Sequence, residues 1–407
     1  MRVAYVCADL GVPCFGSKGC SIHVQEIVRS FLNRGDEVEM FVARPGGSCD
    51  AFLPVKVHEF SPRRCDDTAA REIAAQEVAE RIQAALMVQS PFDLVYERHS
   101  LWSAAGPRFA RQVGIPSILE INAPLIREQR KHRELVNSTL AFEKSQLAFA
   151  SASSLAAVSE EVAQTISQDF EIDLKRLHVI LNGVDTQRFA PSVPALAPAD
   201  VFTIGFVGSL KPWHGVETLL EAFDIFHRDF PQSRLLIIGD GPMRQHLIET
   251  YCSPDRELSK HMNWIGSVSP NDVPGYLTSM DVAVAPYPAM ADFYFSPLKV
   301  FEYMACGVAT VASHVGQLSK LISNGVDGFL YNPHAADLAK TLRFLAEQET
   351  VRREVGIRAR KRAVDEFSWD QVLARSLATV NLGADPCQTE RGEGLNSKLE
   401  QERAQCR

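Results

Sequence analysis

The feature that most constrains the fold of this chain is a regular alternation of short apolar segments with longer amphipathic ones. The apolar segments are rich in Val, Ile, Leu and Ala and have the length of strands. Because parallel strands need a crossover that is usually a helix, this alternation predicts an α/β fold with parallel sheets. The strands expected are 3–7, 38–42, 55–60, 92–96, 117–120, 154–158, 178–181, 202–207, 234–238, 262–264, 282–286, 309–311 and 328–331.

Helices are expected between these strands, where apolar residues recur every three or four positions. The helices expected are 22–34, 67–88, one long helix within 125–149, 216–230, 244–252, 297–306, 335–348, 351–367 and 369–382.

A segment rich in Pro and Ala, residues 190–200, interrupts the alternation, which then starts again. A chain of 407 residues is also too long for one small core. We therefore expect two Rossmann-like α/β domains, over residues 1–190 and 200–367, followed by a helix at 368–382. The polar tail 383–407 lacks periodicity and is expected to be disordered. Two such domains facing each other would place the active site in the cleft between them.

The composition excludes several classes of protein. A net charge of −8 argues against nucleic acid as the main partner, because phosphate binding needs a basic surface. The apolar runs have strand length, so no segment is expected to span a membrane. The nine cysteines include no Cys-x-x-Cys pair, which indicates free thiols in a reducing compartment, with the cytoplasm as the expected location.

The segment 296–307 has the clearest signs of a binding site. Ser296 is a good N-cap, Pro297 suits the first helical position, and Gly307 predicts the end of the helix. Lys299 occupies the position where a capping box would carry Glu or Gln, so the helix start and this cation together form an anion site. Glu302, three residues further on, is placed to accept a hydrogen bond from a ribose hydroxyl. The alternative is an ordinary capped helix with a surface Lys–Glu pair.

Three other strand ends in the second half carry glycine-rich loops. Residues 208–215 include Lys211 and His214, which can face an anion at the next helix start. The segments 239–242 and 266–268 follow the next two strands. Each loop is weak evidence alone, but four in one half are hard to explain by packing.

In the first half, a loop with Gly11 and Gly16 leads into a helix. Its glycine spacing does not fit a dinucleotide fingerprint, and the second strand ends in Arg44 instead of an acidic residue. A loop that approaches a phosphate or sugar is favoured over an NAD site, with a plain loop as the alternative. Polar residues also end two later strands, at 97–99 and at 120–122, which fits a cleft better than a core.

These motifs, in this order, resemble the retaining nucleotide-sugar glycosyltransferases with the GT-B fold, of the family 4 or group 1 type. The resemblance spans about residues 1–380 and rests on 16–23, 181–185 with Phe189, 205–215, 238–242, 281–286, 296–307 and 324–328. It implies that the first domain binds the acceptor, that the second binds the nucleotide-sugar, and that the helix at 368–382 crosses back to the first domain.

The resemblance also implies roles for individual residues. Catalytic roles fall to Arg98 or His99, Lys211, Lys299 and Glu302, with Glu302 holding the donor ribose. The other donor-binding residues are Gly16, Lys18, Gly19, Ser209, His214, Asp240, Gly241, Pro242, Gly266, Val268, Tyr294, Ser296, Pro297 and Leu298. His23 and Asn122 are expected at the acceptor.

Three positions depart from the family pattern. Tyr294 stands where a second glutamate is usual, eight residues before Glu302. Ser209 and His214 replace a usual Arg and Lys. The histidine that commonly ends the fourth strand aligns best with Arg98, with His99 one step on, and adjacent strand residues face opposite ways. The sequence leaves open which of the two enters the cleft.

The function expected is a cytoplasmic, retaining glycosyltransferase that uses a UDP- or GDP-sugar. The expected acceptor is a glycan or lipid-linked saccharide of a cell-surface polysaccharide. We expect no cofactor and no metal, because the metal-binding Asp-x-Asp motif of some relatives does not occur. Glu97 and Glu120 are the carboxylates to test as a double-displacement pair.

Two rival functions stay open: a sugar-nucleotide-binding or regulatory protein that has lost catalysis, and a two-domain oxidoreductase or epimerase. The sequence indicates no oligomeric state. A basic helix face at 129–133 fits either peripheral contact with the inner face of the membrane or a solvated surface.

Overall fold

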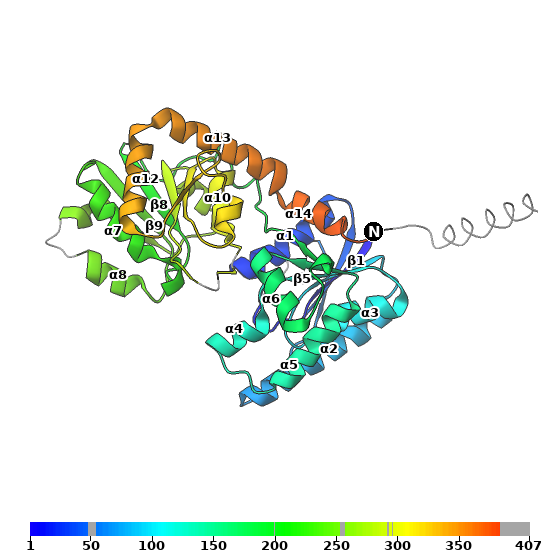
Figure 1. Ribbon diagram of the computed structural model, residues 1–407. Coiled ribbons are helices and arrows are strands. Elements are labelled where there is room, and N and C mark those ends of the chain that lie inside the picture. The colour runs from blue at the N-terminus through cyan, green and yellow to red at the C-terminus, as the bar shows by residue number, and fades with distance from the viewer. Residues whose placement is uncertain (48–53, 199, 253–256, 291–292, 295, 383–407) are drawn as a thin grey trace, which may run out of the picture.

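Two parallel sheets, each with helices on both faces, make up the protein (Figure 1). The computed structural model describes residues 1–47, 54–198, 200–252, 257–290, 293–294 and 296–382. The predicted α/β class with two Rossmann-like sheets is confirmed. The expected tail, 383–407, lies outside the described residues.

The first sheet has the strand order β3-β2-β1-β4-β5-β6-β7. Its strands are β1 (Arg2–Cys7), β2 (Glu37–Val42), β3 (Lys56–Glu59), β4 (Leu94–Arg98), β5 (Ser117–Ile121), β6 (Ser154–Ala157) and β7 (Leu177–Val179). Its helices are α1 (Gly19–Asn33), α2 (Thr68–Gln89), α3 (Ala105–Val113), α4 (Leu125–His132), α5 (Ser138–Ser151) and α6 (Glu160–Phe170). Alternate residues of β1 face opposite cores: Tyr5 packs with α1, whereas Ala4 and Val6 pack with α2 and α3.

The second sheet has the strand order β10-β9-β8-β11-β12-β13. Its strands are β8 (Phe202–Val207), β9 (Ser233–Ile238), β10 (Met262–Gly266), β11 (Val282–Ala285), β12 (Ala309–Ser313) and β13 (Phe329–Tyr331). Its helices are α7 (Val216–His227), α8 (Arg244–Tyr251), α9 (Val273–Leu277), α10 (Leu298–Ala305), α11 (Leu318–Leu321), α12 (Ala335–Glu347) and α13 (Glu349–Glu366).

The chain passes from the first sheet to the second between β7 and β8, and it returns after α13. The returning segment leads into α14 (Trp369–Leu377), which packs against α1 and belongs to the core of the first sheet (Figure 1). The two passages touch, since Val184 N–H donates to Phe367 O at 2.8 Å. A Cβ on Gly183 would lie 2.9 Å from Trp369 Cδ2, so only glycine fits there.

Polar and apolar contacts also join the two halves around the start of α10. Asn182 Nδ2 donates to Ser296 O at 3.0 Å, and Gln317 Nε2 donates to Val158 O at 2.8 Å. Leu298 packs against the core of the first sheet, and Gly19 lies beside it. The first turn of α10 therefore lies between the two sheets.

Each predicted strand is present, but some helix predictions were wrong in detail. The long helix expected within 125–149 is two helices, because the chain turns at 133–137, where Glu72 accepts hydrogen bonds from Val136 N–H and Asn137 N–H. Helices α3, α6, α9 and α11 were not predicted. Helix α10 begins at Leu298 with Pro297 as its N-cap, one residue later than expected from Ser296.

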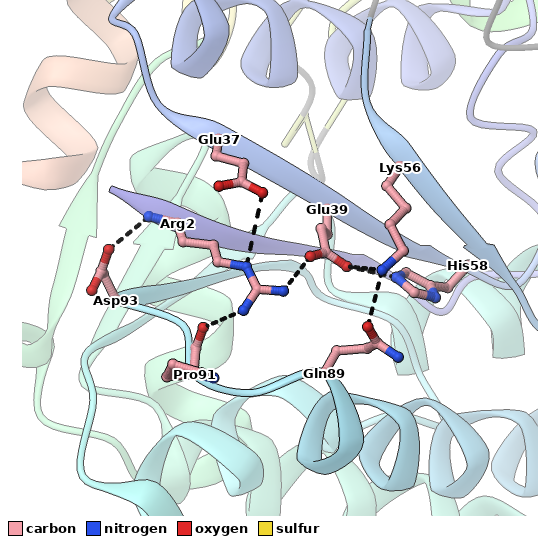
Figure 2. A network of polar contacts seen from close by, with 8 residues as sticks. All are labelled: Arg2, Glu37, Glu39, Lys56, His58, Gln89, Pro91 and Asp93. Carbon is pink, nitrogen blue, oxygen red and sulfur yellow. Dashed lines mark hydrogen bonds and ion pairs between the residues drawn. The ribbon is translucent and has the colours of Figure 1, made fainter.

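A polar network lies at the amino ends of β1, β2 and β3 (Figure 2). The buried Glu39 carboxylate contacts Arg2, lies 3.2 Å from Lys56 Nζ and lies 2.7 Å from His58 Nε2. Burial alone would raise the pKa of Glu39, but its hydrogen bonds to His58, Arg2 and Lys56 lower it to about 2. The Glu39 carboxylate therefore joins β1, β2 and β3 through ion pairs with basic residues of the neighbouring strands.

Among the described residues, the helices fall short of the length and apolar character that crossing a bilayer needs.

Candidate active site

The most unusual side chain near the start of α10 is Lys299. It is only 9% exposed, and its Nζ has no hydrogen-bond partner in the described structure. The ammonium lies 4.1 Å from the ring centroid of Phe206 and 5.3 Å from that of Tyr287. Burial lowers the pKa of Lys299 to about 7, although Glu302 acts in the opposite direction. A buried, unpaired cation beside a helix start is well suited to receive an anion.

Two further basic residues come from the loop after β8, beside Lys299. His214 Nδ1 contacts Ser209 O. Its pKa is lowered to about 4, first by burial and then by the charges of Lys299 and Lys211. Lys211 Nζ lies 5.8 Å from the ring of Trp213. The charges of Lys299 and Lys211 thus disfavour the protonated form of His214, and an anion between these groups would favour it.

The loops after β8, β9 and β10 are joined by backbone hydrogen bonds. Leu210 N–H donates to Asp240 O at 3.0 Å, and Gly239 N–H donates to Gly266 O at 2.8 Å. Gly239 has a φ of +125°, and a Cβ there would lie 2.0 Å from Gly208 O. Close backbone approach therefore requires glycine at position 239, and likewise at 241, where a Cβ would lie 2.6 Å from Leu210 O. These backbone contacts bring the Ser209, Asp240 and Gly266 loops to one place.

Side chains in these three loops differ in exposure. Asp240 is exposed, and its Oδ1 accepts from Gly241 N–H at 2.7 Å. Pro242 is exposed beside it, whereas Val268 packs against the core of the second sheet. Asp240 and Pro242 are therefore accessible to solvent, whereas Gly266 is buried.

Glu302 is partly buried on α10, one turn beyond Lys299. Burial raises its pKa to about 6, against the lowering effects of Arg188 first and Lys299 second. Arg188, from the first passage between the sheets, donates from Nη2 to Pro270 O at 2.8 Å. We missed Arg188 from the sequence, although it lies next to Phe189 in a motif that carried the resemblance. Arg188 links Glu302 electrostatically to the loop after β10.

On the other side of the cleft, Glu120 at the end of β5 collects polar partners. Its carboxylate accepts from Tyr96 OH at 2.5 Å, lies 2.8 Å from His23 Nε2 and 3.4 Å from Arg98 Nη1, and contacts Asn122 Nδ2. Burial acts to raise the pKa of Glu120, but His23 and Arg98 outweigh it and lower the pKa to about 2. Sequence reasoning predicted His23, Arg98 and Asn122 separately, and the structure brings them together on one carboxylate.

A cavity of about 830 Å³ opens beside this cluster. Arg98 and His99 both line it, so the backbone allows both side chains to reach the cleft. His99 is 5% exposed, and neither ring nitrogen has a partner in the described structure. Burial, and then the Arg98 charge, lower its pKa to about 3, so His99 is neutral at ordinary pH.

Glu97, one of the two carboxylates to test as a catalytic pair, lies away from the cavity. It accepts from Ser103 Oγ and Gly106 N–H, each at 2.7 Å, and thereby holds the start of α3. Burial raises its pKa to about 7. Glu97 therefore has a structural position. Of the two carboxylates, Glu120 is the one that contacts residues lining the cavity, Arg98 and Asn122.

Matches to protein families cover most of the chain. Residues 201–348 match the model described as "Glycosyl transferases group 1", and residues 17–188 match the model of "Glycosyltransferase Family 4". The chain belongs to these glycosyltransferases. The two matches divide between the two sheets, so the site described above lies where the two family regions meet.

Relatives of this glycosyltransferase have varied names. The alpha-maltose-1-phosphate synthase of Mycolicibacterium smegmatis is 25% identical over 93% of this chain and 98% of its own. The UDP-Gal:alpha-D-GlcNAc-diphosphoundecaprenol alpha-1,3-galactosyltransferase of Escherichia coli is 26% identical over 60% of this chain and 64% of its own.

Solved structures support the GT-B fold. HepE of Anabaena, in complex with UDP, has a TM-score of 0.69 at 19% identity and covers 93% of this chain and 100% of its own. The sucrose-phosphate synthase of Thermosynechococcus elongatus has a TM-score of 0.68 at 17% identity, over 92% of this chain and 96% of its own.

Of the remaining predicted site residues of the glycosyltransferase, Gly19 and Ser296 lie beside the first turn of α10. Gly16 O accepts from Gln25 Nε2 at 2.9 Å, Lys18 is exposed, and Gly19 lies beside Leu298. Ser296 Oγ is buried without a partner in the described structure. Tyr294 instead lines the cavity of the first domain and packs among the side chains around α5 and α6, so it bridges the two halves.

Proposed function

We propose that this glycosyltransferase transfers a sugar from a UDP- or GDP-sugar to a glycan or lipid-linked saccharide, with retention of anomeric configuration. The pathway we propose is the synthesis of a cell-surface polysaccharide. The observation that carries the proposal is Lys299: a buried ammonium without a partner, at a helix start, between the two family regions.

The donor site is assigned as follows. Lys299, His214 and Lys211, with Ser209 and the turn 296–298, surround the diphosphate. Glu302 accepts hydrogen bonds from the ribose, and the base lies against residues 240–242, Gly266 and Val268. The loop with Gly16, Lys18 and Gly19 covers the diphosphate and the transferred sugar, because Gly19 lies beside the first turn of α10.

Catalysis then rests on stabilising the leaving nucleoside diphosphate. As the bond between the anomeric carbon of the sugar and the diphosphate oxygen breaks, negative charge grows on the diphosphate, where fixed cations and backbone N–H groups stabilise it. Tyr294 supplies no carboxylate in the place where the family usually has one, so we assign catalysis to Lys299, Lys211 and Glu302.

The acceptor occupies the cavity lined by Arg98, His99 and Asn122, with His23 and Glu120 beneath it. A double displacement needs two carboxyl groups about 5–5.5 Å apart that flank the sugar. Glu97 holds the start of α3, and Glu120 is occupied by His23, Arg98, Tyr96 and Asn122. Front-face transfer is therefore favoured, with a diphosphate oxygen or a nearby backbone group taking the acceptor proton.

We propose further that the reaction needs no metal. The support is the absence of Asp-x-Asp from the sequence and the supply of positive charge by Lys299 and Lys211. The location proposed is the cytoplasm, with peripheral contact to the inner face of the membrane as an extension of that proposal.

The test is thermal stabilisation of the protein by UDP-, GDP-, ADP- and CMP-sugars and by NAD(P), with and without magnesium. A ligand at 100-fold its dissociation constant adds about 2.7 kcal/mol, which is readily seen. We expect stabilisation by one uridine or guanosine donor, unchanged by magnesium, and its loss in Lys299→Met but not in the exposed control Lys340→Met. Stabilisation by NAD(P) alone, or an equal loss of donor stabilisation in both variants, would refute the donor site. A separate assay distinguishes an enzyme from a binding protein: an enzyme releases the nucleotide when an acceptor is added.

A further inference from the structure

Four arginines gather at the carboxyl ends of β2 and β3, and the function proposed above gives them no role. Arg44 follows β2, Arg63 and Arg64 lie in the loop after β3, and Arg71 lies in the first turn of α2. Arg63, Arg64 and Arg71 line a second cavity, of about 410 Å³. Arg44 Nη1 donates to Leu10 O at 3.2 Å, and Leu10 lines the same cavity.

This second cavity adjoins the one that holds His99. Leu10 and Arg71 line both, so the Arg98–His99 end of the first cavity and the arginines belong to neighbouring cavities. Each cavity has the size of the small-molecule sites found in proteins, about 300–1,000 Å³. Two neighbouring cavities of this size can hold two parts of one extended ligand.

Among the described residues, Arg63 is the one member of the cluster that forms an ion pair with a carboxylate. Asp67 accepts from Ala70 N–H as the N-cap of α2, and the Glu72 carboxylate accepts from Val136 N–H and Asn137 N–H. Glu77 pairs with Arg63 at 3.1 Å, and Asp66 is the one carboxylate among the residues lining the second cavity.

Two of the arginines keep their charge available for a ligand. Arg71 donates to the neutral Thr68 Oγ1 at 3.0 Å, and in the described structure neither Arg64 nor Arg71 pairs with a carboxylate. Both side chains are exposed, so their guanidinium groups are accessible to a ligand.

We propose that this arginine cluster binds a phosphate or diphosphate group carried by the acceptor, whose hydroxyl reacts at the His99 end of the cavity. The proposal rests on the proposed glycosyl transfer and narrows its acceptor to an anionic, phosphate-bearing saccharide. Guanidinium groups suit this ligand because their paired N–H donors match phosphate oxygens. The phosphate can belong to a soluble sugar phosphate or to a lipid-linked saccharide, since the two share this chemistry.

The first experiment measures binding of inorganic pyrophosphate by calorimetry in the Lys299→Met background, which lacks the main cation of the donor site. Adding Arg64→Gln and Arg71→Gln together should raise the dissociation constant at least about tenfold. The matched control is Arg108→Gln, an exposed arginine on α3, which should leave the constant unchanged. Equal binding by all three proteins would overturn the proposal, whether or not the donor site is correct.

The second experiment compares acceptors in the full-length enzyme with the nucleotide-sugar that stabilises it. A sugar 1-phosphate, a polyprenyl-diphosphate saccharide in detergent and a neutral methyl glycoside serve as the three acceptors. We expect Arg64→Gln/Arg71→Gln to lower kcat/KM for one or both phosphate-bearing acceptors at least about tenfold, with the donor KM unchanged. The preferred phosphate-bearing acceptor shows whether the phosphate belongs to a soluble sugar phosphate or to a lipid-linked saccharide.

A preference for the neutral glycoside, or an equal loss with all three acceptors, would contradict the proposal. If no nucleotide-sugar binds at all, the proposed function fails, and the pyrophosphate titration still decides whether the arginine site exists.

Discussion

Two buried charges, Glu39 and Lys299, show how this protein divides stability from function. Glu39 is 3% exposed and Lys299 is 9% exposed, so each charged group pays a desolvation free energy on folding. Glu39 has Arg2, Lys56 and His58 as partners (Figure 2), whereas the Lys299 ammonium has no hydrogen-bond partner in the described structure. The first charge is compensated by the fold itself. The second has only the rings of Phe206 and Tyr287 and the charge of Glu302 nearby, and we propose that the donor diphosphate binds there.

The largest effect should come from Lys299→Met. We expect the rate of sugar transfer to fall about 10²–10³-fold, as is typical when a group that stabilises developing charge is removed. The folded state should be no less stable than the wild type, because an unpaired buried charge has been replaced by an apolar side chain of similar length. Enzyme assays measure the rate of sugar transfer, and urea unfolding of the same variant measures the stability of the folded state. A large loss of stability together with the loss of rate would mean that Lys299 is structural.

Glu39→Gln should give the opposite pattern. Arg2, Lys56 and His58 would lose a common negative partner, so we expect the free energy of unfolding to fall by about 1–3 kcal/mol. The activity of the folded protein should stay unchanged, because the network lies at the amino ends of the strands, away from the cleft. Urea unfolding and kcat measurements at saturating substrate check this pattern.

The contribution of Glu39 to the free energy of unfolding should depend on pH in a defined way. Its pKa of about 2 in the folded protein lies below the value of about 4.3 of an unfolded glutamate. The stabilisation is therefore fully present above about pH 4.3 and is lost as the pH falls through 2. The difference in stability between wild type and Glu39→Gln should shrink over that window. A difference that stays constant down to pH 2 would contradict the assignment.

Donor affinity should depend on pH through Lys299 and Glu302. With a pKa of about 7, Lys299 is charged below pH 7, and affinity for the nucleoside diphosphate should fall by up to about tenfold per pH unit above it. With a pKa of about 6, Glu302 becomes protonated below pH 6 and accepts hydrogen bonds from the ribose less well. Calorimetric titration between pH 5 and 9 should show tightest binding at about pH 6–7. Glu302→Gln should remove only the loss of donor affinity below pH 6. A donor affinity that does not change with pH in the wild type would contradict the roles of both Lys299 and Glu302.

The smallest effect is expected from His58→Phe. The new ring can keep the stacking of His58 on Phe41, whose centroids lie 4.5 Å apart, while Glu39 keeps Arg2 and Lys56. The loss in free energy of unfolding should be below about 1 kcal/mol, as for a partly exposed ion pair. Thermal unfolding at pH 7 checks it. A loss as large as that of Glu39→Gln would show that His58 alone compensates the carboxylate.

Much of the fold could be predicted because it depends on local pattern. Strands such as 202–207 were placed to the residue, since a buried parallel strand is a continuous apolar run bounded by glycine. The break between α4 and α5 was missed because its cause is distant: Glu72, more than sixty positions earlier, holds the turn at Val136 and Asn137. Helix α10 started one residue late because Asn182, from the passage between the sheets, holds Ser296 O.

The site divides in the same way. Lys299 and Glu302 could be found because their spacing on one helix puts them on one side of it, and the strand-end glycines because a turn requires them. Arg188 could not be found, because its effect on Glu302 arises where the passage between the sheets meets α10. Glu97 was misplaced because adjacent residues of a strand face opposite sides, and periodicity alone does not say which side is the cleft.

The sequence by itself determined the parallel α/β class, the positions of the strands, and the residue types at the strand ends, because these follow from local hydrophobic period and turn chemistry. Only the tertiary structure decided which charges have partners. It surrounds Glu39 and Glu120 with partners from distant strands and helices, and it leaves Lys299 with none in the described structure. Whether a charge is compensated depends on every element packed around it, and that information is not local to any stretch of the chain.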